Sequence, residues 1–380
     1  MMRIAVVSHV RHPIRPPFMG GMEAHSWHLV RALKERGHDV TLFAAGDSDP
    51  DFALRPILDR HYDAEFPWHD HHGTDVLNRH VDRAFARTAR DLLDGGFDVI
   101  HNNSLHRYPP RLARQHRLPM VTSLHVPPFD ALHRAVRESP APWSRFTTTS
   151  ERQVASWWPE GAPECTHVVH NGIDADAFPF VPEGDGSAVW AGRITPNKGT
   201  HFAITAAQFT GVPLTIFGAI EHRDYFETMI RPYLKGQIRY GGHLSGGDLA
   251  RELGRASVSL FTPLWDEPFG LAAVEAMSCG VPVAAIDMGA VREVVGDEAG
   301  RFAPPNQPAA LGLAMRRAMK IDRRIPRARV EENFTLSRMV SGYERAYDAA
   351  RAGLEGSALP VEFPGLELTI APPAPLLAAE

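Results

Sequence analysis

The chain has 380 residues, of which 44% are hydrophobic and 22% charged, and its formal net charge at pH 7 is -5. This composition is that of a globular protein, the length predicts two domains, and the charge gives no reason to expect a nucleic-acid partner. The only cysteines, Cys165 and Cys279, exclude a disulfide framework. No apolar run is long enough for a signal peptide or a membrane span, so we expect a cytoplasmic protein.

The first residues predict a Rossmann-like opening. A buried strand is expected over residues 4–7, a loop over residues 8–22 and, after a helix, a second strand over residues 40–44. A strand, a glycine-containing loop and a helix in this order are typical of doubly wound α/β domains. The loop ends in Gly20 and Gly21 but lacks the G-x-G-x-x-G pattern, which argues against a dinucleotide oxidoreductase.

Residues 50–75 are predicted to form an irregular segment that is rich in histidine. Its histidines include His61, His69, His71 and His72. Neighbouring histidines on a loop rarely converge on a metal, so we favour the lining of a substrate site or a plain loop. Asp47 and Asp49 form a D-x-D just before this segment, and we interpret them as caps of a polar turn. We therefore predict no metal ion.

The helix predicted over residues 76–93 carries four arginines at helical spacing. They are Arg79, Arg83, Arg87 and Arg90. Positions i, i+4, i+8 and i+11 lie on one face of a helix, so these side chains form a stripe. A solvated face is the favoured interpretation, and peripheral contact with an anionic membrane surface or an anionic substrate is the alternative.

His125 directly follows a strand predicted over residues 120–124. Open parallel sheets bind their ligands at the carboxyl ends of the strands, so this position favours a functional histidine over a structural one. We expect the first domain to span residues 1–178, and a linker with several Pro and Gly residues to span residues 179–187.

The second domain, expected over residues 188–335, repeats the alternation of strands and helices. Its strands are predicted over residues 188–191, 214–217, 258–261 and 283–286. Later helices are predicted over residues 309–319 and 336–350, and the tail over residues 351–380 has no clear period. The whole pattern predicts an α/β fold with parallel sheets.

A basic loop follows the first strand of this domain. It contains Arg193 and Lys198 in the pattern G-R-x4-K-G. A planar guanidinium and a compact ammonium group together suit two phosphates. Gly218, at the end of the next strand, is a candidate for a nucleobase pocket.

Two carboxylates, Glu267 and Glu275, bracket the beginning of an apolar helix that we expect to start beside Phe269. Pro268 suits a first helical turn, and Gly270 lets a ligand approach the backbone. At about 1.5 Å rise per residue the two glutamates are at most about 12 Å apart along the axis. That separation disfavours a hydrolytic pair, whose carboxyl groups lie within about 9.5 Å, and suits the two ends of one long ligand.

Three motifs in this order resemble those of family 4 retaining glycosyltransferases, which have the GT-B fold of two Rossmann-like domains facing a central cleft. The motifs are Gly20-Gly21, Arg193 with Lys198, and Glu267-x7-Glu275. The resemblance covers about residues 1–350. It implies transfer of a hexose from a nucleotide diphosphate sugar to an unidentified acceptor, with retention of the anomeric configuration. It also implies that the last helix packs back on the first domain.

The resemblance assigns roles to individual residues. The implied catalytic residues are His125, Arg193, Lys198 and Glu267. The implied donor-binding residues are Gly20, Gly21, Gly218, Phe269, Gly270, Leu271 and Glu275. Because the basic loop would neutralise the diphosphate, no metal and no cofactor are expected. Two alternatives stay open, namely a GT-B sugar-nucleotide epimerase or hydrolase, and a non-catalytic sugar-nucleotide sensor.

Overall fold

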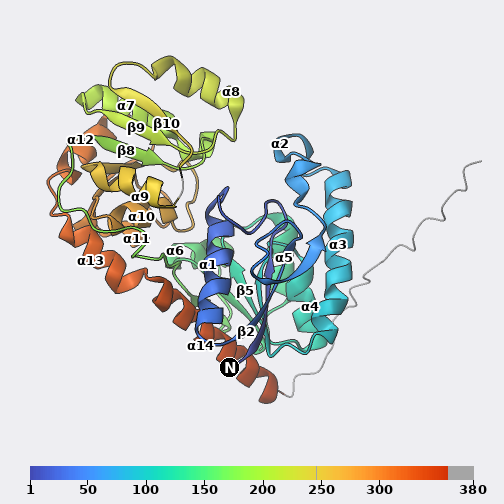
Figure 1. Ribbon diagram of the computed structural model, residues 1–380. Coiled ribbons are helices and arrows are strands. Elements are labelled where there is room, and N and C mark those ends of the chain that lie inside the picture. The colour runs from blue at the N-terminus through green and yellow to red at the C-terminus, as the bar shows by residue number, and fades with distance from the viewer. Residues whose placement is uncertain (245, 358–380) are drawn as a thin grey trace, which may run out of the picture.

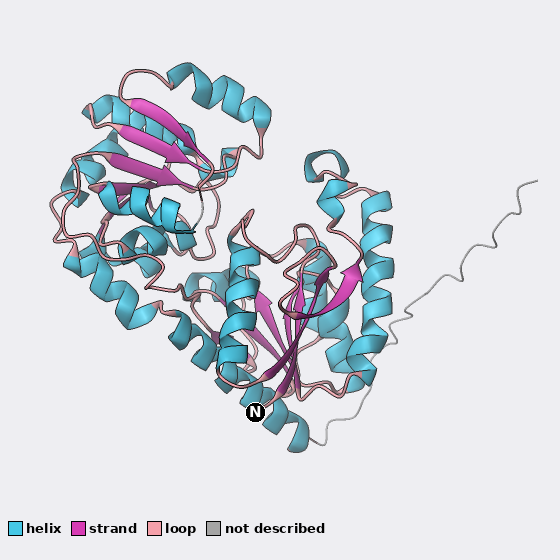
Figure 2. Ribbon diagram, viewed as in Figure 1, coloured by secondary structure: helices cyan, strands magenta, loops and turns pink. Residues whose placement is uncertain are grey.

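The computed structural model describes residues 1–244 and 246–357, and it contains two β-sheets that lie in separate lobes with helices around each (Figures 1 and 2). The first sheet has the strand order β3-β2-β1-β4-β5-β6-β7, and the second has the order β10-β9-β8-β11-β12-β13. Every neighbouring pair in both sheets is parallel. The predicted α/β fold with parallel sheets is confirmed.

The elements around the first sheet come mainly from the first half of the chain. The strands are β1 (Arg3–Ser8), β2 (Asp39–Ala45), β3 (Ala53–Leu58), β4 (Val99–Asn103), β5 (Met120–Leu124), β6 (Ser144–Thr148) and β7 (Thr166–Val168). The helices are α1 (Gly21–Glu35), α2 (Trp68–His71), α3 (Asp75–Asp94), α4 (Tyr108–His116), α5 (Asp130–Glu138) and α6 (Glu151–Trp157).

The elements around the second sheet follow in the same alternation. The strands are β8 (Ala188–Ala191), β9 (Leu214–Phe217), β10 (Ile238–Gly242), β11 (Val258–Phe261), β12 (Val283–Ile286) and β13 (Gly300–Ala303). The helices are α7 (Thr200–Thr210), α8 (Arg223–Tyr225), α9 (Gly246–Arg255), α10 (Leu271–Ser278), α11 (Val291–Ala299), α12 (Pro308–Ala318) and α13 (Arg324–Asn333). The last helix is α14 (Leu336–Glu355).

Alternation along β1 divides the core of the first domain into two layers. Ile4 and Val6 pack in one cluster with side chains of α1 and α14, whereas Ala5 and Val7 belong to a second cluster with side chains of α3. Successive side chains of a strand point to opposite faces of the sheet. Because helices cover both faces, the central strands are continuous apolar runs, which is why the sequence predicts them well.

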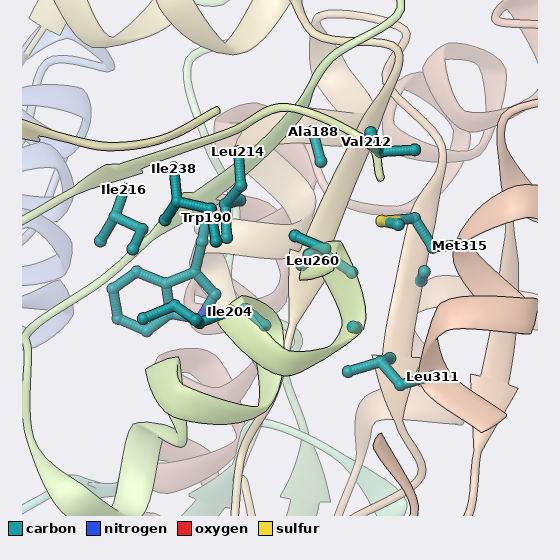
Figure 3. Packing of buried hydrophobic residues seen from close by; sticks show 14 of the residues in the cluster. Ala188, Trp190, Ile204, Val212, Leu214, Ile216, Ile238, Leu260, Leu311 and Met315 are labelled. Carbon is teal, nitrogen blue, oxygen red and sulfur yellow. The ribbon is translucent and has the colours of Figure 1, made fainter. Parts of the chain in front are cut away.

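The core of the second domain surrounds Trp190 of β8. Figure 3 shows its indole ring near Ile204 of α7 and Leu260 of β11, and the same cluster includes Leu311 of α12. The indole Nε1 donates a hydrogen bond of 2.9 Å to Thr262 Oγ1, so the buried N–H has a partner. This packed sheet supports the loops that follow β8 and β9.

Helix α14 follows α13 of the second domain but packs on the first (Figure 1). Its Tyr343 and Tyr347 are fully buried in the cluster that contains Ile4 and Val6. The helix continues to Glu355, and most of the expected tail, residues 358–380, lies outside the described residues. Within the described chain, no helix combines the length and the apolarity that crossing a membrane requires.

The segment over residues 50–75 and the helix α13 are among the regions that differ from the sequence prediction. The segment over residues 50–75 is not wholly irregular, because it contains the edge strand β3 and the short helix α2. Pro56 and the exposed positions of Ala53 and Arg55 hide the strand pattern, as is usual at a sheet edge. Helix α13 was not predicted, because its only buried residues are Pro326 and Val330 and it has little apolar period.

Candidate active site

Glycines of the first domain meet predicted site residues of the second. A Cβ placed on Gly20 would lie 3.7 Å from Arg193 Nε, and a Cβ on Gly21 would lie 2.9 Å from Leu271 Cδ1. Gly21 is the first residue of α1, so a side chain there would require the Leu271 side chain to move. The structure therefore brings the glycine pair, the basic loop and the start of α10 together at the interface between the domains.

Gly218 occupies a position that only glycine fits. Its φ is 145°, and a Cβ would lie 1.7 Å from the carbonyl oxygen of Gly192. The hydroxyl of Tyr240 donates a hydrogen bond of 2.8 Å to the Gly218 carbonyl. Gly218 thus lets the loops after β8 and β9 approach each other, and its place in a nucleobase pocket stays a prediction.

Lys198 and Glu267, both predicted to be catalytic, form an ion pair. Lys198 Nζ lies 2.7 Å from Glu267 Oε2, and the same oxygen accepts a hydrogen bond of 2.7 Å from Trp265 Nε1. The ammonium group also lies 4.9 Å from the centre of the Trp265 ring. Because Glu267 is buried, these contacts compensate the cost of removing its charge from water.

Arg193 is paired with a carboxylate that sequence reasoning missed. Glu221, which follows β9, accepts from Arg193 Nη1 at 2.7 Å and from Arg11 Nη2 of the first domain at 2.7 Å. Burial alone would raise the pKa of Glu221, but the two guanidinium groups hold the pKa below its ordinary value. This arrangement links the two domains. Both predicted phosphate-binding cations, Arg193 and Lys198, therefore have a carboxylate partner.

The start of α10 differs from the prediction. The helix begins at Leu271, and Gly270 before it has a left-handed φ of 102°. Pro268 therefore does not lie in the first helical turn, and its carbonyl instead accepts hydrogen bonds from the hydroxyls of Thr149 and Ser150, at 3.0 and 2.7 Å. These bonds tie the segment before α10 to the first domain.

The side chain of Phe269 lies in the hydrophobic core. It is 3% exposed, and its ring centre lies 5.4 Å from that of Phe334 and 6.0 Å from that of His170. A ligand could therefore meet Phe269 only through its backbone. The side chain anchors the loop on which Glu267 lies.

Glu275 lies on α10 and is half-buried. Burial raises its pKa to about 7. Among residues 1–244 and 246–357 its carboxyl group has no hydrogen-bond or ion-pair partner. A carboxyl group held in this way is able to accept hydrogen bonds from ligand hydroxyls.

We expect Glu275→Gln to remove a pH dependence of stability. The folded-state pKa lies above the ordinary value of 4.5, so between about pH 4.5 and 7 the folded protein binds more protons than the unfolded chain. The wild-type free energy of unfolding should therefore fall as the pH rises through this window, by about 1–3 kcal/mol relative to the variant. Urea unfolding of both proteins at pH 5 and pH 8 measures this difference, and equal pH profiles would contradict it.

Two further carboxylates join the domains at the amino end of α6. Glu293 accepts from the backbone N–H of Glu151 at 2.9 Å and of Arg152 at 3.1 Å, where the helix dipole favours an anion. Asp266 accepts from Arg152 Nε at 2.9 Å and from Ser156 Oγ at 2.5 Å. The partners are more than a hundred residues apart in the chain, so no local pattern could have indicated them. A small crevice here is lined by Pro127, Arg152, Gln153, Ser156, Asp266, Glu267 and Pro268.

His125 lies at the carboxyl end of β5, where the sequence placed it, and it is largely buried. Its Nε2 lies 3.0 Å from Asn103 Oδ1. Burial, reinforced by His101 and His9, lowers the pKa of His125 to about 3. The side chain is therefore neutral across the physiological pH range. Within the described residues it makes no direct hydrogen bond to Arg193, Lys198 or Glu267.

The acidic and histidine-rich segments have local partners. Asp47 Oδ2 lies 2.5 Å from His61 Nδ1, and Asp49 Oδ2 accepts from Trp27 Nε1 at 2.6 Å. The ring of His72 lies 3.9 Å from that of Trp68, centre to centre. Over the described ranges no group of three or more His, Cys, Asp or Glu side chains is arranged to hold a metal ion.

The four arginines of α3 are exposed. Arg79, Arg83, Arg87 and Arg90 are all open to solvent. In the part of the chain that the structure describes, none of them has an ion-pair partner. They form a basic stripe on the surface of the first domain.

Comparison with known proteins finds a matching protein family for each half of the chain. A family model described as Glycosyltransferase Family 4 matches residues 19–177, and one described as Glycosyl transferases group 1 matches residues 175–335. The chain is 28% identical to a glycogen synthase of Mycobacterium tuberculosis, over 93% of this chain and 96% of that protein. It is 26% identical to a phosphatidyl-myo-inositol mannosyltransferase of Mycobacterium leprae, over 78% of this chain and 83% of that protein.

Solved structures share the fold. A sucrose-phosphate synthase from Thermosynechococcus elongatus has a TM-score of 0.75 at 20% identity, over 93% of this chain and all of that chain. Anabaena HepE, in a complex with UDP-glucose, has a TM-score of 0.72 at 17% identity, over 92% of this chain and all of that chain. The two family models together span residues 19–335, and the chain belongs to the family 4 glycosyltransferases, which have the GT-B fold.

Proposed function

We propose that this glycosyltransferase moves a hexose from a nucleotide diphosphate sugar to an acceptor, with retention of the anomeric configuration and without a metal ion or other cofactor. The main support is the meeting of Arg193, the pair of Lys198 with Glu267, and the beginning of α10 at one domain interface. A structural neighbour in complex with UDP-glucose supports the class of donor.

In this proposal the residues divide along the donor. Lys198 and Arg193 bind the diphosphate and stabilise the charge that grows on the leaving group. Glu267 holds hexose hydroxyls, and Glu275 holds those of the ribose. The bond between the anomeric carbon and the phosphate oxygen breaks, the acceptor oxygen bonds to that carbon from the same face, and its proton passes to the departing phosphate. The protein contributes positioning and leaving-group stabilisation.

The test combines donor binding with product analysis. Thermal shifts against UDP-, GDP- and ADP-sugars identify the donor, since a ligand at 100 times its Kd stabilises by about 2.7 kcal/mol. Turnover with the donor found should then give a glycosylated product whose anomer NMR assigns. Nucleotide release without such a product would indicate a hydrolase, binding without turnover would indicate a sensor, and activity lost to chelator and restored by magnesium would refute metal independence.

We expect Glu221→Gln to tighten nucleoside diphosphate binding about three- to fivefold. The variant removes the negative charge that pairs with Arg193, and a partly exposed ion pair is worth up to about 1 kcal/mol. Isothermal titration with the diphosphate of the donor measures the change. Glu227→Gln, which removes an exposed partner of Arg231, is the matched control. Weaker binding in the Glu221 variant would mean that this carboxylate positions Arg193 for the phosphates.

A basic surface supports one further part of the proposal, namely peripheral contact with anionic lipid. The four arginines of α3 are exposed and lack ion-pair partners within the described chain. Sedimentation with anionic liposomes at low salt should retain the wild type and lose Arg83→Glu/Arg87→Glu, and added salt should weaken the binding. Arg251→Glu, on the second domain, is the control. Absence of binding at low salt would leave these arginines as a solvated face.

A further inference from the structure

A chain of hydrogen bonds connects the last helix of the protein to His125. Tyr347 of α14 contacts His101 Nδ1 at 2.7 Å, and His101 Nε2 lies 2.8 Å from Asn103 Oδ1. The same amide oxygen lies 3.0 Å from His125 Nε2. Thus one oxygen of Asn103 holds two imidazole rings, and this chain of bonds connects α14 to His125.

The chemistry of these groups determines where the hydrogens lie. An amide oxygen only accepts, so His101 and His125 must both carry their hydrogen on Nε2. Tyr347 must then donate its hydroxyl hydrogen to His101 Nδ1. The amide nitrogen of Asn103 donates to Ser26 Oγ at 3.4 Å, which orients the oxygen towards the rings. Burial lowers the pKa of His101 to about 4, so both rings are neutral at pH 7.

The second nitrogen of His125 remains available for a ligand. His125 Nδ1 makes no hydrogen bond to any described residue. Nδ1 of His25 is fully buried and has no partner in the described chain, whereas Nδ1 of His125 is not fully buried. With its hydrogen on Nε2, His125 presents at Nδ1 a lone pair that accepts a hydrogen bond.

We propose that Asn103 is a positioning residue that fixes the tautomer of His125, with Tyr347 and His101 orienting its amide, so that His125 Nδ1 accepts a hydrogen bond from a hydroxyl of the donor sugar. The sugar contact rests on the proposed function, whereas the tautomer does not. Tyr347 and His101 are fully buried, so water does not compete for these bonds. The crossing of α14 to the first domain would then support the site as well as the core.

The first test measures the wild-type protein and uses a variant only for assignment. In the wild type labelled with 15N-histidine, long-range 1H–15N spectra distinguish the two tautomers, and His125→Gln assigns the signal. We expect the Nε2–H form for His125 at pH 7. The Nδ1–H form, or an imidazolium ion, would overturn the proposal even if glycosyl transfer is demonstrated, and the Nε2–H form would support the assignment even if the transfer test fails.

The second test uses variants and kinetics. Asn103→Leu should give His125 a mixture of tautomers and lower kcat about tenfold, with little change in donor KM. Tyr347→Phe should lower kcat about threefold. Tyr343→Phe removes a buried hydroxyl from the same helix, 3.4 Å from His25 Nε2, and keeps the ring that packs against His101 at 4.6 Å between centres, so it should lower kcat less than Tyr347→Phe. An unchanged kcat in Asn103→Leu, or equal losses in the two tyrosine variants, would overturn the positioning role.

Discussion

Replacement of Glu267 by glutamine is expected to lower kcat about ten- to hundredfold and to raise the donor KM less. Glu267 would hold the hexose, whose ring flattens and gains positive charge as the glycosidic bond breaks, so a fixed carboxylate favours the transition state. Losing one charged hydrogen bond, at about 1.5–3 kcal/mol, accounts for this range. Steady-state kinetics with varied donor concentration measure both constants.

Glu275→Gln provides the matched comparison for Glu267→Gln. Ribose lies far from the reacting carbon, so its contacts should be nearly equal in the ground and transition states. We therefore expect this variant to raise the donor KM while kcat changes little. If Glu275→Gln abolishes kcat at saturating donor and Glu267→Gln only shifts KM, the donor binds in the reverse orientation.

Alanine at Lys198 or at Arg193 is expected to weaken nucleoside diphosphate binding about ten- to hundredfold, because each cation would bind phosphate through charged hydrogen bonds of about 1.5–3 kcal/mol. The two variants should differ in stability. Lys198→Ala leaves the buried Glu267 without its cation, which costs about 3–5 kcal/mol, whereas Glu221 keeps Arg11 when Arg193 is removed. Titration calorimetry and thermal unfolding of each variant measure the two effects.

A double variant separates these two roles of Lys198. Lys198→Ala/Glu267→Gln should recover most of the lost stability, because no buried charge is left unpaired, but it should not recover diphosphate affinity. Arg251→Ala, which removes an exposed arginine of α9, is the control for general loss of positive charge. Wild-type affinity in both single variants would refute the assignment of the basic loop to phosphate.

Much of the fold could be predicted because its information is local. Strands β5, β8, β9, β11 and β12 have the predicted bounds, since buried parallel strands are short apolar runs between turn residues. The order of the glycine pair, the basic loop and the paired glutamates indicated the family that the comparisons confirm. Where the local signal is weak, as in β3 with its proline and exposed side chains, the prediction failed.

The sequence by itself determined the two α/β domains, the family and the residues expected to matter, whereas the tertiary structure decided what each of those residues contacts. Lys198 pairs with Glu267, Arg193 shares Glu221 with Arg11, and α10 begins at Leu271 because the segment before it bonds to the first domain. Periodicity reports only which face of an element is buried. Ion pairs and hydrogen-bond chains between distant segments depend on how the domains close on each other, which no local pattern encodes.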